Sequence, residues 1–401
     1  MAGPLAGLRV LECAQIMAGP TCGALLADLG AEVIKVEKIP GGDDARAYRE
    51  PRIRGVSAPF LVMNRNKRGI ALDFKHPLGR DALLRLVDGA DILIENFRPG
   101  TLDRLGLGWE ALHARRPELI YGSISGYGLT GPLGSQGGFD LVAQAFAGMM
   151  SITGEPGRPP AKVGSSVADL NAGLLAASGI LAAVIHRLRT GEGQRVDTSL
   201  MEAALHQTGW HASVWFATGA SPGPLGSSHV LAAPYQAFRT RDRWIVIGGA
   251  NQTNWMRLCE VLGHPEWTAD PRFQDNSARM THREALVAGI EAVLSEHDAA
   301  HWLAALDAAG VPAGPVQNVG EALSHPQTLA REMVVDLPHP AGGQTPALGV
   351  PVKFSATPGS VNRPAPSLGE HTCEVLREQG FTESEIEVLL ASGAAHQSTD
   401  C

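Results

Sequence analysis

The first half of this chain alternates short apolar runs with longer segments that have the period of an amphipathic helix. Strands are predicted at residues 8–13, 32–36, 70–74, 91–95, 119–125 and 195–199, and helices at 21–29, 79–87, 141–150, 170–188 and 201–215. Strands that alternate with helices in this way form a parallel sheet covered by helices, and ligands collect at the carboxyl ends of the strands. The alternation therefore predicts an α/β domain.

The second half changes character after a stretch rich in Gly, Pro and Ser at residues 218–234, which is typical of a linker or an active-site loop. An antiparallel pair of strands is predicted at 235–247, with helices at 254–262, 282–294 and 299–308; after a second Pro/Gly-rich stretch at 339–351, we expect a strand at 352–355 and helices at 370–378 and 383–391. The prediction is a large α/β domain at 1–217, a small α+β domain at 226–325, and a return segment at 326–401 that completes the large domain.

Composition and charge exclude several classes of protein. The formal charge of −8 and the pI near 6.0 argue against a nucleic-acid binder, which normally has a basic face. Five cysteines without a CxxC pair indicate neither a disulfide framework nor a zinc site, and no metal ligand is predicted. The N-terminus lacks the basic segment of a signal peptide, and the longest apolar stretch, 170–185, has 16 residues, too few for an ordinary membrane span. We therefore expect a soluble cytoplasmic protein without membrane contact.

Two segments match short functional motifs in sequence but lack the structural context that these motifs require. Residues 126–131 match GxGxxG after a strand, but Pro132 and further glycines follow, so no helix begins there and an NAD site is not predicted. Residues 219–223 match the GxSxG nucleophile elbow, but Pro222 has no N–H to act as the oxyanion donor. Both segments are interpreted as loops.

Polar and cationic residues cluster near the ends of predicted strands. Lys75 follows the strand at 70–74, and Asn96, Phe97 and Arg104 follow the strand at 91–95. Because the carboxyl ends of parallel strands meet at one edge, these residues can converge there. The cations suit phosphates, and Asn96 and Phe97 suit a base or a pantetheine chain. The alternative is a solvated rim, since charge clusters usually face water.

Asp169 stands at the start of the most apolar predicted helix, 170–188. A carboxylate at this place commonly caps the helix N-terminus and is favoured by the helix dipole. The second interpretation is a carboxylate nucleophile at the edge of an apolar helix, where desolvation makes it more reactive. The pattern of residues leaves both interpretations open.

An ordered set of short motifs extends along nearly the whole chain. The set comprises AGP at 18–20, AEVIKVE at 31–37, NRNKR at 64–68, ENFRPG at 95–100, LGLG at 105–108, GYGLTGP at 126–132, QA at 144–145, SVAD at 166–169, TGEGQ at 190–194, PYQAF at 234–238 and LGEHT at 368–372. Together these motifs resemble the family III CoA-transferases, also called the CaiB/BaiF family.

The resemblance implies a Rossmann-like large domain made from N- and C-terminal parts, a small domain, and two chains interlocked as a homodimer. It implies that Asp169 is the nucleophile. Lys38 stands where other members carry arginine, which alters the phosphate contact, and Met17 replaces a glutamine of formyl-CoA transferases, which disfavours that substrate. Family positions that bind CoA map onto Ile16, Lys38, Leu72, Lys75, Asn96, Phe97 and Arg104.

The implied activity is reversible transfer of CoA from an acyl-CoA to a free carboxylic acid, through an aspartyl anhydride and an aspartyl-CoA thioester. Because these intermediates conserve the thioester energy, we expect no metal and no tightly bound cofactor, with CoA and acyl-CoA as substrates. Similarity of residues 64–68 and 234–238 to succinate–hydroxymethylglutarate CoA-transferases favours succinyl-CoA or a related dicarboxylyl-CoA. Candidate contacts are Arg46, Arg65 and His229 for the second carboxylate and the backbones of Gly248 and Gly249 for an oxyanion.

Two alternatives from other classes stay open. The 2-methylacyl-CoA racemases and epimerases of the same family carry a His-Asp pair after the glycine-rich loop, whereas this chain has Phe139 and Asp140 there. One of the two acid/base partners is therefore missing, which favours the transferase. A non-catalytic CoA-binding protein would retain affinity for CoA and use Asp169 as a helix cap.

Overall fold

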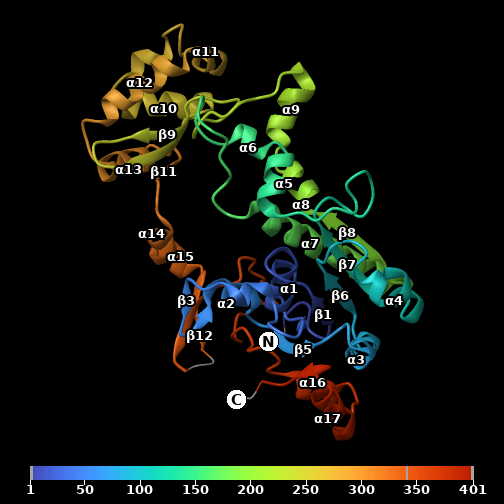
Figure 1. The fold of residues 1–401 in the computed structure, drawn as a ribbon. Coiled ribbons are helices and arrows are strands. Elements are labelled where there is room, and N and C mark those ends of the chain that lie inside the picture. The colour runs from blue at the N-terminus through green and yellow to red at the C-terminus, as the bar shows by residue number, and fades with distance from the viewer. Residues whose placement is uncertain (1–2, 340–341, 399–401) are drawn as a thin grey trace. The chain divides into compact units, whose positions relative to one another are not determined.

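The computed structural model describes residues 3–339 and 342–398, and the chain divides into two compact units (Figure 1). The large unit comprises Met1–Ala147, Gly164–Gln207 and Pro326–Cys401, and the small unit comprises Gly148–Val163 and Thr208–His325. The C-terminal segment thus returns to the large unit. Residues 148–163 and 208–217, assigned to the large domain from the sequence, lie in the small unit.

Within the described residues, seven strands form the sheet of the large unit, in the order β14-β5-β2-β1-β6-β7-β8. Every pairing is parallel except that of β14 with β5 at one edge. The parallel α/β sheet predicted from the sequence is confirmed. The strands are β1 Arg9–Cys13, β2 Glu32–Glu37, β5 Arg68–Leu72, β6 Ile92–Glu95, β7 Ile120–Ser125, β8 Arg195–Ser199 and β14 Ala395–His396.

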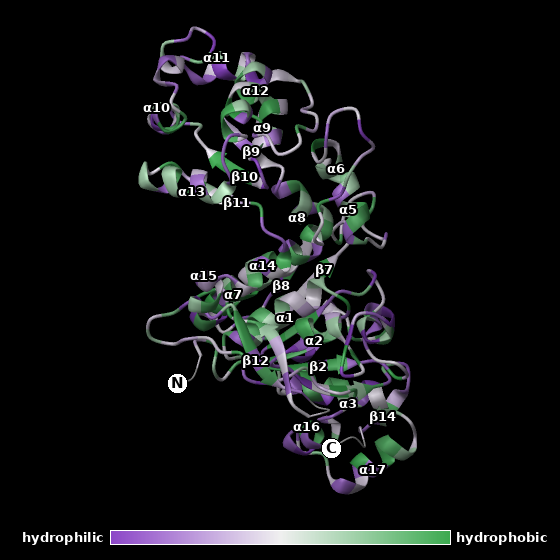
Figure 2. Cartoon of the chain, turned by 90° about the vertical axis from the view of Figure 1, so that its left-hand side faces the viewer, coloured by the Kyte–Doolittle hydropathy of each residue, from purple (hydrophilic) through white to green (hydrophobic). Residues whose placement is uncertain are grey.

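Helices cover both faces of this sheet, which explains why its strands are largely apolar runs. Every residue of β5 and β7 is buried, as expected for a parallel sheet with two covered faces. One face packs on α3, α16 and α17, through a core that includes Leu83, Val375 and Ile386, and the other packs on α1 and α7. Stretches of green in Figure 2 mark the apolar residues. The helices are α1 Ala18–Asp28, α2 Ala58–Asn64, α3 Pro77–Asp88, α4 Trp109–Arg115, α5 Asp140–Phe146, α7 Val167–Thr190, α8 Leu200–His206, α15 Pro326–Ala330, α16 Thr372–Glu378 and α17 Glu383–Ala391.

The small unit is built on an antiparallel sheet in the order β11-β10-β9. The antiparallel pair predicted at 235–247 is confirmed as β9 and β10. Its core encloses Phe238, Ile245 and Trp255. The elements are β9 Tyr235–Arg239, β10 Trp244–Gly248, β11 Ala313–Pro315, α6 Met149–Ile152, α9 Gly209–Thr218, α10 Gln252–Val261, α11 Asn276–Thr281, α12 Arg283–Leu294, α13 Ala299–Ala308 and α14 Val319–Ser324.

Several local predictions are wrong. The helix predicted at 201–215 is two helices, α8 and α9, and the one predicted at 141–150 is interrupted at Gly148, which has a left-handed φ of 79°. No strand is found at 352–355, although this range is described; the chain pairs earlier, as β12 (Val334–Pro338) with β13 (Gln344–Leu348). A further hairpin, earlier in the chain, joins β3 (Arg52–Ile53) to β4 (Val56–Ser57).

Helix α7 is longer than its sequence indicated. With 24 residues it is, by length and composition alone, apolar enough to cross a membrane. Its Ala172, Ala176 and Ile180 are buried in the large unit, where the helix packs on α1, β7 and β8. A Cβ added at Gly173 would lie 2.6 Å from the carbonyl oxygen of Ala18, so glycine lets α7 approach the start of α1 closely. Burial in the core therefore accounts for part of the apolar composition of α7, while other apolar side chains of the helix, including Leu174 and Leu188, are exposed.

Candidate functional site

The carboxyl ends of β1, β2, β5 and β6 meet at one edge of the large sheet. A pocket of about 290 Å³ opens at this edge, and its walls include Gln15, Ala18, Asn96, Phe97 and Phe139. Elements far apart in the sequence therefore contribute to one cavity. The predicted CoA contacts on segments that follow these strands are Ile16 after β1, Lys38 after β2, Lys75 after β5, and Asn96, Phe97 and Arg104 after β6.

Asn96 joins two of these strand ends. Its Oδ1 accepts a hydrogen bond from the backbone N–H of Gln15 at 2.9 Å, and its Nδ2 donates to the carbonyl oxygen of Gln15 at 2.8 Å. Both polar atoms of the side chain are engaged in holding the turn after β1. Asn96 consequently shapes the pocket wall by fixing the backbone of a neighbouring turn.

Glu95 holds the next turn in a similar way. Its Oε2 accepts a hydrogen bond from the backbone N–H of Phe97 at 2.9 Å, and its Oε1 accepts one from the hydroxyl group of Ser123 on β7. Burial raises the pKa of Glu95 to about 7, although the two hydrogen bonds favour the charged form. The carboxyl group thereby orients Phe97 in the wall of the pocket.

Three cations lie at the same edge. Lys38 forms an ion pair with Asp44, Arg104 approaches the hydroxyl oxygen of Thr101 with its Nη2 at 3.4 Å, and Lys75 is exposed. Exposed cations after successive strands suit a polyanionic ligand such as the phosphates of a nucleotide.

Leu72 differs from the other predicted CoA contacts. Its side chain is fully buried in the core between the sheet and α3, and its strand β5 lies between β2 and β14. The side chain therefore does not reach the pocket surface.

Asp169 lies in the first turn of α7 but does not cap it. The backbone N–H of Ala168 donates instead to Oδ1 of Asp140 at 2.9 Å, while Oδ2 of Asp140 accepts a hydrogen bond from Gln144 at 2.7 Å. Among the residues that the structure describes, the Asp169 carboxyl group makes no hydrogen bond and no ion pair. The capping interpretation thus applies to Asp140.

The environment of Asp169 disfavours its charged form. Burial and, second, the negative charge of Asp140 raise its pKa to about 7. Asp169 precedes Gly173 by one helical turn, and Gly173 packs against Ala18. Residues four apart lie on the same face of a helix. Asp169 is therefore on the face of α7 that packs against the start of α1, where Met17 is the N-cap and Ala18 the first helical residue. A carboxyl group of raised pKa therefore lies near the turn after β1.

Arg46 and Arg65, the predicted contacts of a second carboxylate, are engaged in ion pairs of their own. The Nε of Arg46 donates to Oε2 of Glu37 at 2.7 Å, and its guanidinium carbon lies 3.6 Å from the ring centre of Phe60. Arg65 pairs with the buried carboxylate of Asp28. Both guanidinium groups stabilise the fold locally, so neither is a free cation awaiting a substrate.

His229, Gly248 and Gly249 lie in the small unit. The imidazole of His229 stacks on Tyr235, with 5.2 Å between ring centres, and meets Trp210 edge-on. The N–H of Gly248 donates to the carbonyl oxygen of Pro312 at 2.8 Å, so it is used within the sheet. Gly249, just beyond β10, is the better oxyanion candidate of the two.

Sequence reasoning missed two features. The first is the role of Asp140, which entered the sequence analysis only because Phe139, and not histidine, precedes it. The hydrogen bond from the N–H of Ala168 at the start of α7 to Asp140 has no signal in the neighbouring sequence. The second is a buried group of charges, Glu12, Lys35, Asp43 and Lys67. Here a signal existed, because Glu12 and Lys35 interrupt otherwise apolar strands, and charges at such positions are rarely buried without partners.

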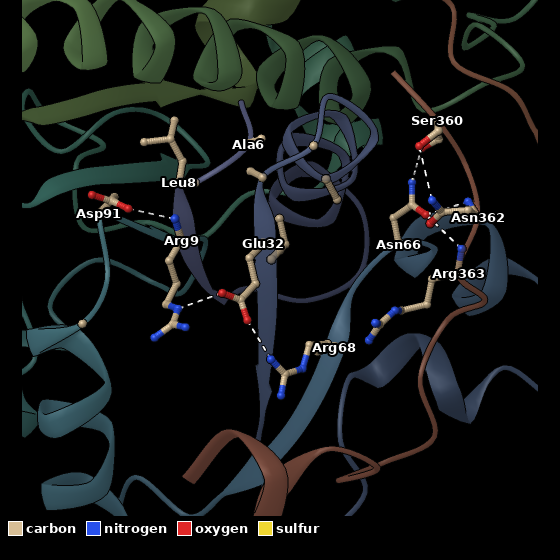
Figure 3. Close-up of a pocket in the computed structure, with 16 residues that line it drawn as sticks. Ala6, Leu8, Arg9, Glu32, Asn66, Arg68, Asp91, Ser360, Asn362 and Arg363 are labelled. Carbon is tan, nitrogen blue, oxygen red and sulfur yellow. Dashed lines mark hydrogen bonds and ion pairs between the residues drawn. The ribbon is translucent and has the colours of Figure 1, made fainter. Parts of the chain in front are cut away.

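A larger pocket, of about 530 Å³, lies at the opposite edge of the sheet, where the strands begin (Figure 3). Two of its three arginines are paired: Arg9 contacts Glu32 at 2.8 Å, and Arg68 contacts Glu32 at 2.7 Å as well as two carboxylates of α16. The third, Arg363, is exposed and approaches the imidazole of His371 rather than a carboxylate. Carboxylates thus neutralise most of the positive charge at this edge.

Fold and site together define an α/β protein with exposed cations at the carboxyl edge of its large sheet. A carboxyl group of raised pKa, that of Asp169, lies near the turn after β1. A family model described as CoA-transferase family III matches residues 5–372. The chain belongs to this family of enzymes, as predicted from its motifs.

Individual relatives agree with this assignment. The succinate–glutarate CoA-transferase of Agrobacterium fabrum is 39% identical to this chain, covering 94% of it and 95% of the relative. The acetyl-CoA:oxalate CoA-transferase of Acetobacter aceti is 40% identical, covering 96% and 97%. The crystal structure of a CaiB/BaiF family protein from Brucella suis matches with a TM-score of 0.84 and 40% identity, covering 94% of this chain and all of that one.

Proposed function

We propose that this CoA-transferase exchanges CoA between a dicarboxylyl-CoA, such as succinyl-CoA, and a free carboxylic acid, with Asp169 as its nucleophile. The observation that carries the proposal is the state of Asp169, which has no hydrogen bond among the described residues and a pKa raised to about 7. A carboxylate that has lost stabilising partners is more reactive toward a carbonyl carbon. Asp140 caps α7 in its place and repels its charge.

The reaction consists of paired acyl transfers. The Asp169 carboxylate attacks the thioester carbonyl carbon, the C–S bond breaks, and CoA leaves as thiolate from a mixed anhydride. The thiolate attacks the aspartyl carbonyl carbon, which releases the donor acid as a carboxylate and leaves an aspartyl-CoA thioester. The acceptor carboxylate attacks that thioester and expels the thiolate, which then attacks the acceptor's acyl carbon. This last step releases the new acyl-CoA and restores Asp169.

The cations at the sheet edge account for CoA binding in this proposal. Lys38, Lys75 and Arg104 would contact phosphates, while the wall around Phe97 would receive apolar parts of the ligand. Because Lys38 is paired with Asp44, its net attraction for a phosphate is weaker than that of exposed Lys75. The N–H of Gly249 would stabilise the oxyanion that each attack develops.

The substrate class follows from the relatives. One relative is named for succinate and glutarate and another for oxalate, and all three acids are dicarboxylates. With Arg46 and Arg65 engaged in ion pairs, His229 is the remaining predicted contact for a second carboxylate.

We also propose that the active form is an interlocked homodimer. Leu174, Ile185 and Leu188 of α7 are exposed although they lie along one side of a core helix, and Leu188 is 78% exposed. Apolar surface of this kind on a soluble enzyme is typical of a subunit interface. A second copy of the chain would cover it.

The test is incubation of the protein with succinyl-CoA and a panel of mono- and dicarboxylic acids, with the thioester products separated by mass. We expect new dicarboxylyl-CoA products without ATP, and none with Asp169→Asn. Exchange of the α-proton of 2-methylacyl-CoA in deuterated water, without an acceptor acid, would instead support a racemase. CoA binding with neither reaction would support the non-catalytic alternative.

A further inference from the structure

Four charged side chains form a buried group beneath the turn after β1. They are Glu12 on β1, Lys35 on β2, Asp43 and Lys67, each at most 3% exposed. The Nζ of Lys35 lies 3.1 Å from Oε1 of Glu12 and 2.8 Å from Oδ2 of Asp43, and the Nζ of Lys67 lies 2.7 Å from Oε2 of Glu12. The parallel register that sets Glu12 beside Lys35 creates the group.

Burial of four charges calls for an explanation other than stability. Apolar residues of similar volume often stabilise a core as well as or better than buried ion pairs do, because removing charges from water is costly. The Cβ that any other residue would add at Gly23 would lie 1.8 Å from Oε2 of Glu12, so α1 leaves room for this group. The contacts of the four charges indicate another role.

They hold the backbone of the turn between β1 and α1. The Nζ of Lys35 donates to the carbonyl oxygen of Ala14 at 2.9 Å. Oδ1 of Asp43 accepts a hydrogen bond from the N–H of Ile16 at 2.9 Å. Just beyond the turn, in the first turn of α1, the Nζ of Lys67 donates to the carbonyl oxygen of Pro20 at 3.0 Å. Buried charges thus bind the turn at its start and middle, and the helix that follows it.

The middle contact stabilises a strained conformation. Ile16 has a φ of 66°, in the left-handed region that a β-branched residue rarely adopts. Such a conformation persists only where the surroundings enforce it. The bond to Asp43 and the clamp of Asn96 on Gln15 are the contacts that do so here.

Lys35 and Asp43 form the permanently charged pair of the group. Burial disfavours the ammonium group of Lys35, but Glu12 and Asp43 together raise its pKa above the ordinary value. Burial likewise disfavours the Asp43 carboxylate, yet Lys35 and the backbone bonds hold the pKa of Asp43 below its usual range. By contrast, burial and the charge of Lys35 lower the pKa of Lys67 to about 8. The Lys35–Asp43 pair is therefore the constant anchor of Ile16.

We propose that Asp43, oriented by Lys35, is a positioning residue that sets the affinity for CoA by fixing the Ile16 turn, without touching the ligand. This inference rests on the proposed function and on the prediction that Ile16 contacts CoA, and its neighbours Gln15 and Ala18 line the pocket at the sheet edge. The turn must already have its strained shape before CoA arrives, because ordering it on binding would subtract from the affinity.

The experiment compares Asp43→Ala and Asp43→Asn with a matched control, Asp28→Ala, in the full-length protein. Asp28 is equally buried and pairs with Arg65, but contacts no part of the turn. We measure the Kd for CoA by calorimetry, hydrogen–deuterium exchange over residues 14–20, the Tm, and KM and kcat for succinyl-CoA.

We expect Asp43→Ala to raise the Kd and KM at least 10-fold, about 1.4 kcal/mol, to speed exchange over the turn at least 10-fold, and to leave kcat within twofold. Asp43→Asn retains an acceptor for the Ile16 N–H, so its effects should be smaller but above threefold. Asp28→Ala should lower the Tm while Kd and exchange over the turn stay within twofold. Where Asp43→Ala does not fold, Asp43→Asn decides.

A Kd within twofold of wild type in the Asp43 variants would overturn the proposal, as would unchanged exchange over the turn or an equal loss of CoA affinity in Asp28→Ala. Failure of the proposed reaction has a different signature. In that case the wild-type protein would transfer no CoA, while Asp43→Ala would still weaken CoA binding and loosen the turn. A wild type without CoA affinity would contradict both proposals.

Discussion

Replacement of Asp169 by Asn should abolish CoA transfer and, above neutral pH, make the protein more stable. Asn has nearly the same shape as Asp but cannot ionise, so it removes the nucleophile and a disfavoured charge together. An aspartate that only capped the helix predicts little change in stability instead, because Asn caps a helix about as well as Asp. The structure gives the capping role to Asp140, so no cap is lost.

The stability change follows from the pKa. A carboxyl group whose pKa rises from 3.8 to about 7 on folding destabilises the native state wherever the group is ionised in the unfolded chain. For the full shift, the loss of stability is about 4 kcal/mol at pH 8 and about 1.7 kcal/mol at pH 5. Because Asp169 is only partly buried, screening by solvent reduces these figures to about 2 and about 1 kcal/mol. The contribution of Asp169 to stability should fall as the pH rises from 4 to 7, so the Asn variant should gain stability relative to wild type over this range.

The assay is urea unfolding of wild type and Asp169→Asn at pH 5 and pH 8, with transfer of CoA from succinyl-CoA measured on the same preparations. Asp140→Asn is the control for helix capping, because Asn caps about as well as Asp. Two results would refute the reasoning: substantial transfer by Asp169→Asn, with deamidation excluded by peptide mass, or an Asn variant less stable than wild type at pH 8.

Three further predictions follow from the same geometry. The kcat/KM should decline as the pH falls below about 7, because Asp169 becomes protonated, and Asp140→Asn should move this decline to lower pH in a pH–rate profile. Lys75→Ala and Arg104→Ala should each weaken CoA binding by about 1–3 kcal/mol in calorimetry without a change in Tm; unchanged affinity in both would misplace the phosphate site. If two chains interlock, the Tm should rise with protein concentration, and dilution should yield no folded monomer in analytical ultracentrifugation; an active monomer would contradict the dimer.

Residues close together in the sequence were enough to predict the sheet. The runs at 32–36, 70–74 and 91–95 are apolar because parallel strands are buried on both faces, and this requirement acts on each strand separately. The same reasoning placed cations and Asn96 after strand ends, since the direction of a parallel strand decides which edge its end reaches. It also located Asp169 at the start of a helix, because helix starts have local signatures.

Only the tertiary structure decided which groups meet. Asp140 reaches the start of α7 from 28 residues earlier in the chain, and this contact, rather than any feature near Asp169, separates the cap from the candidate nucleophile. Arg46 and Arg65 carry the charge expected of contacts for a substrate carboxylate, but in the structure they form ion pairs with Glu37 and Asp28. The partner of a buried charge is set by the register and packing of distant segments, and a pattern along the chain contains no information about which distant group satisfies it.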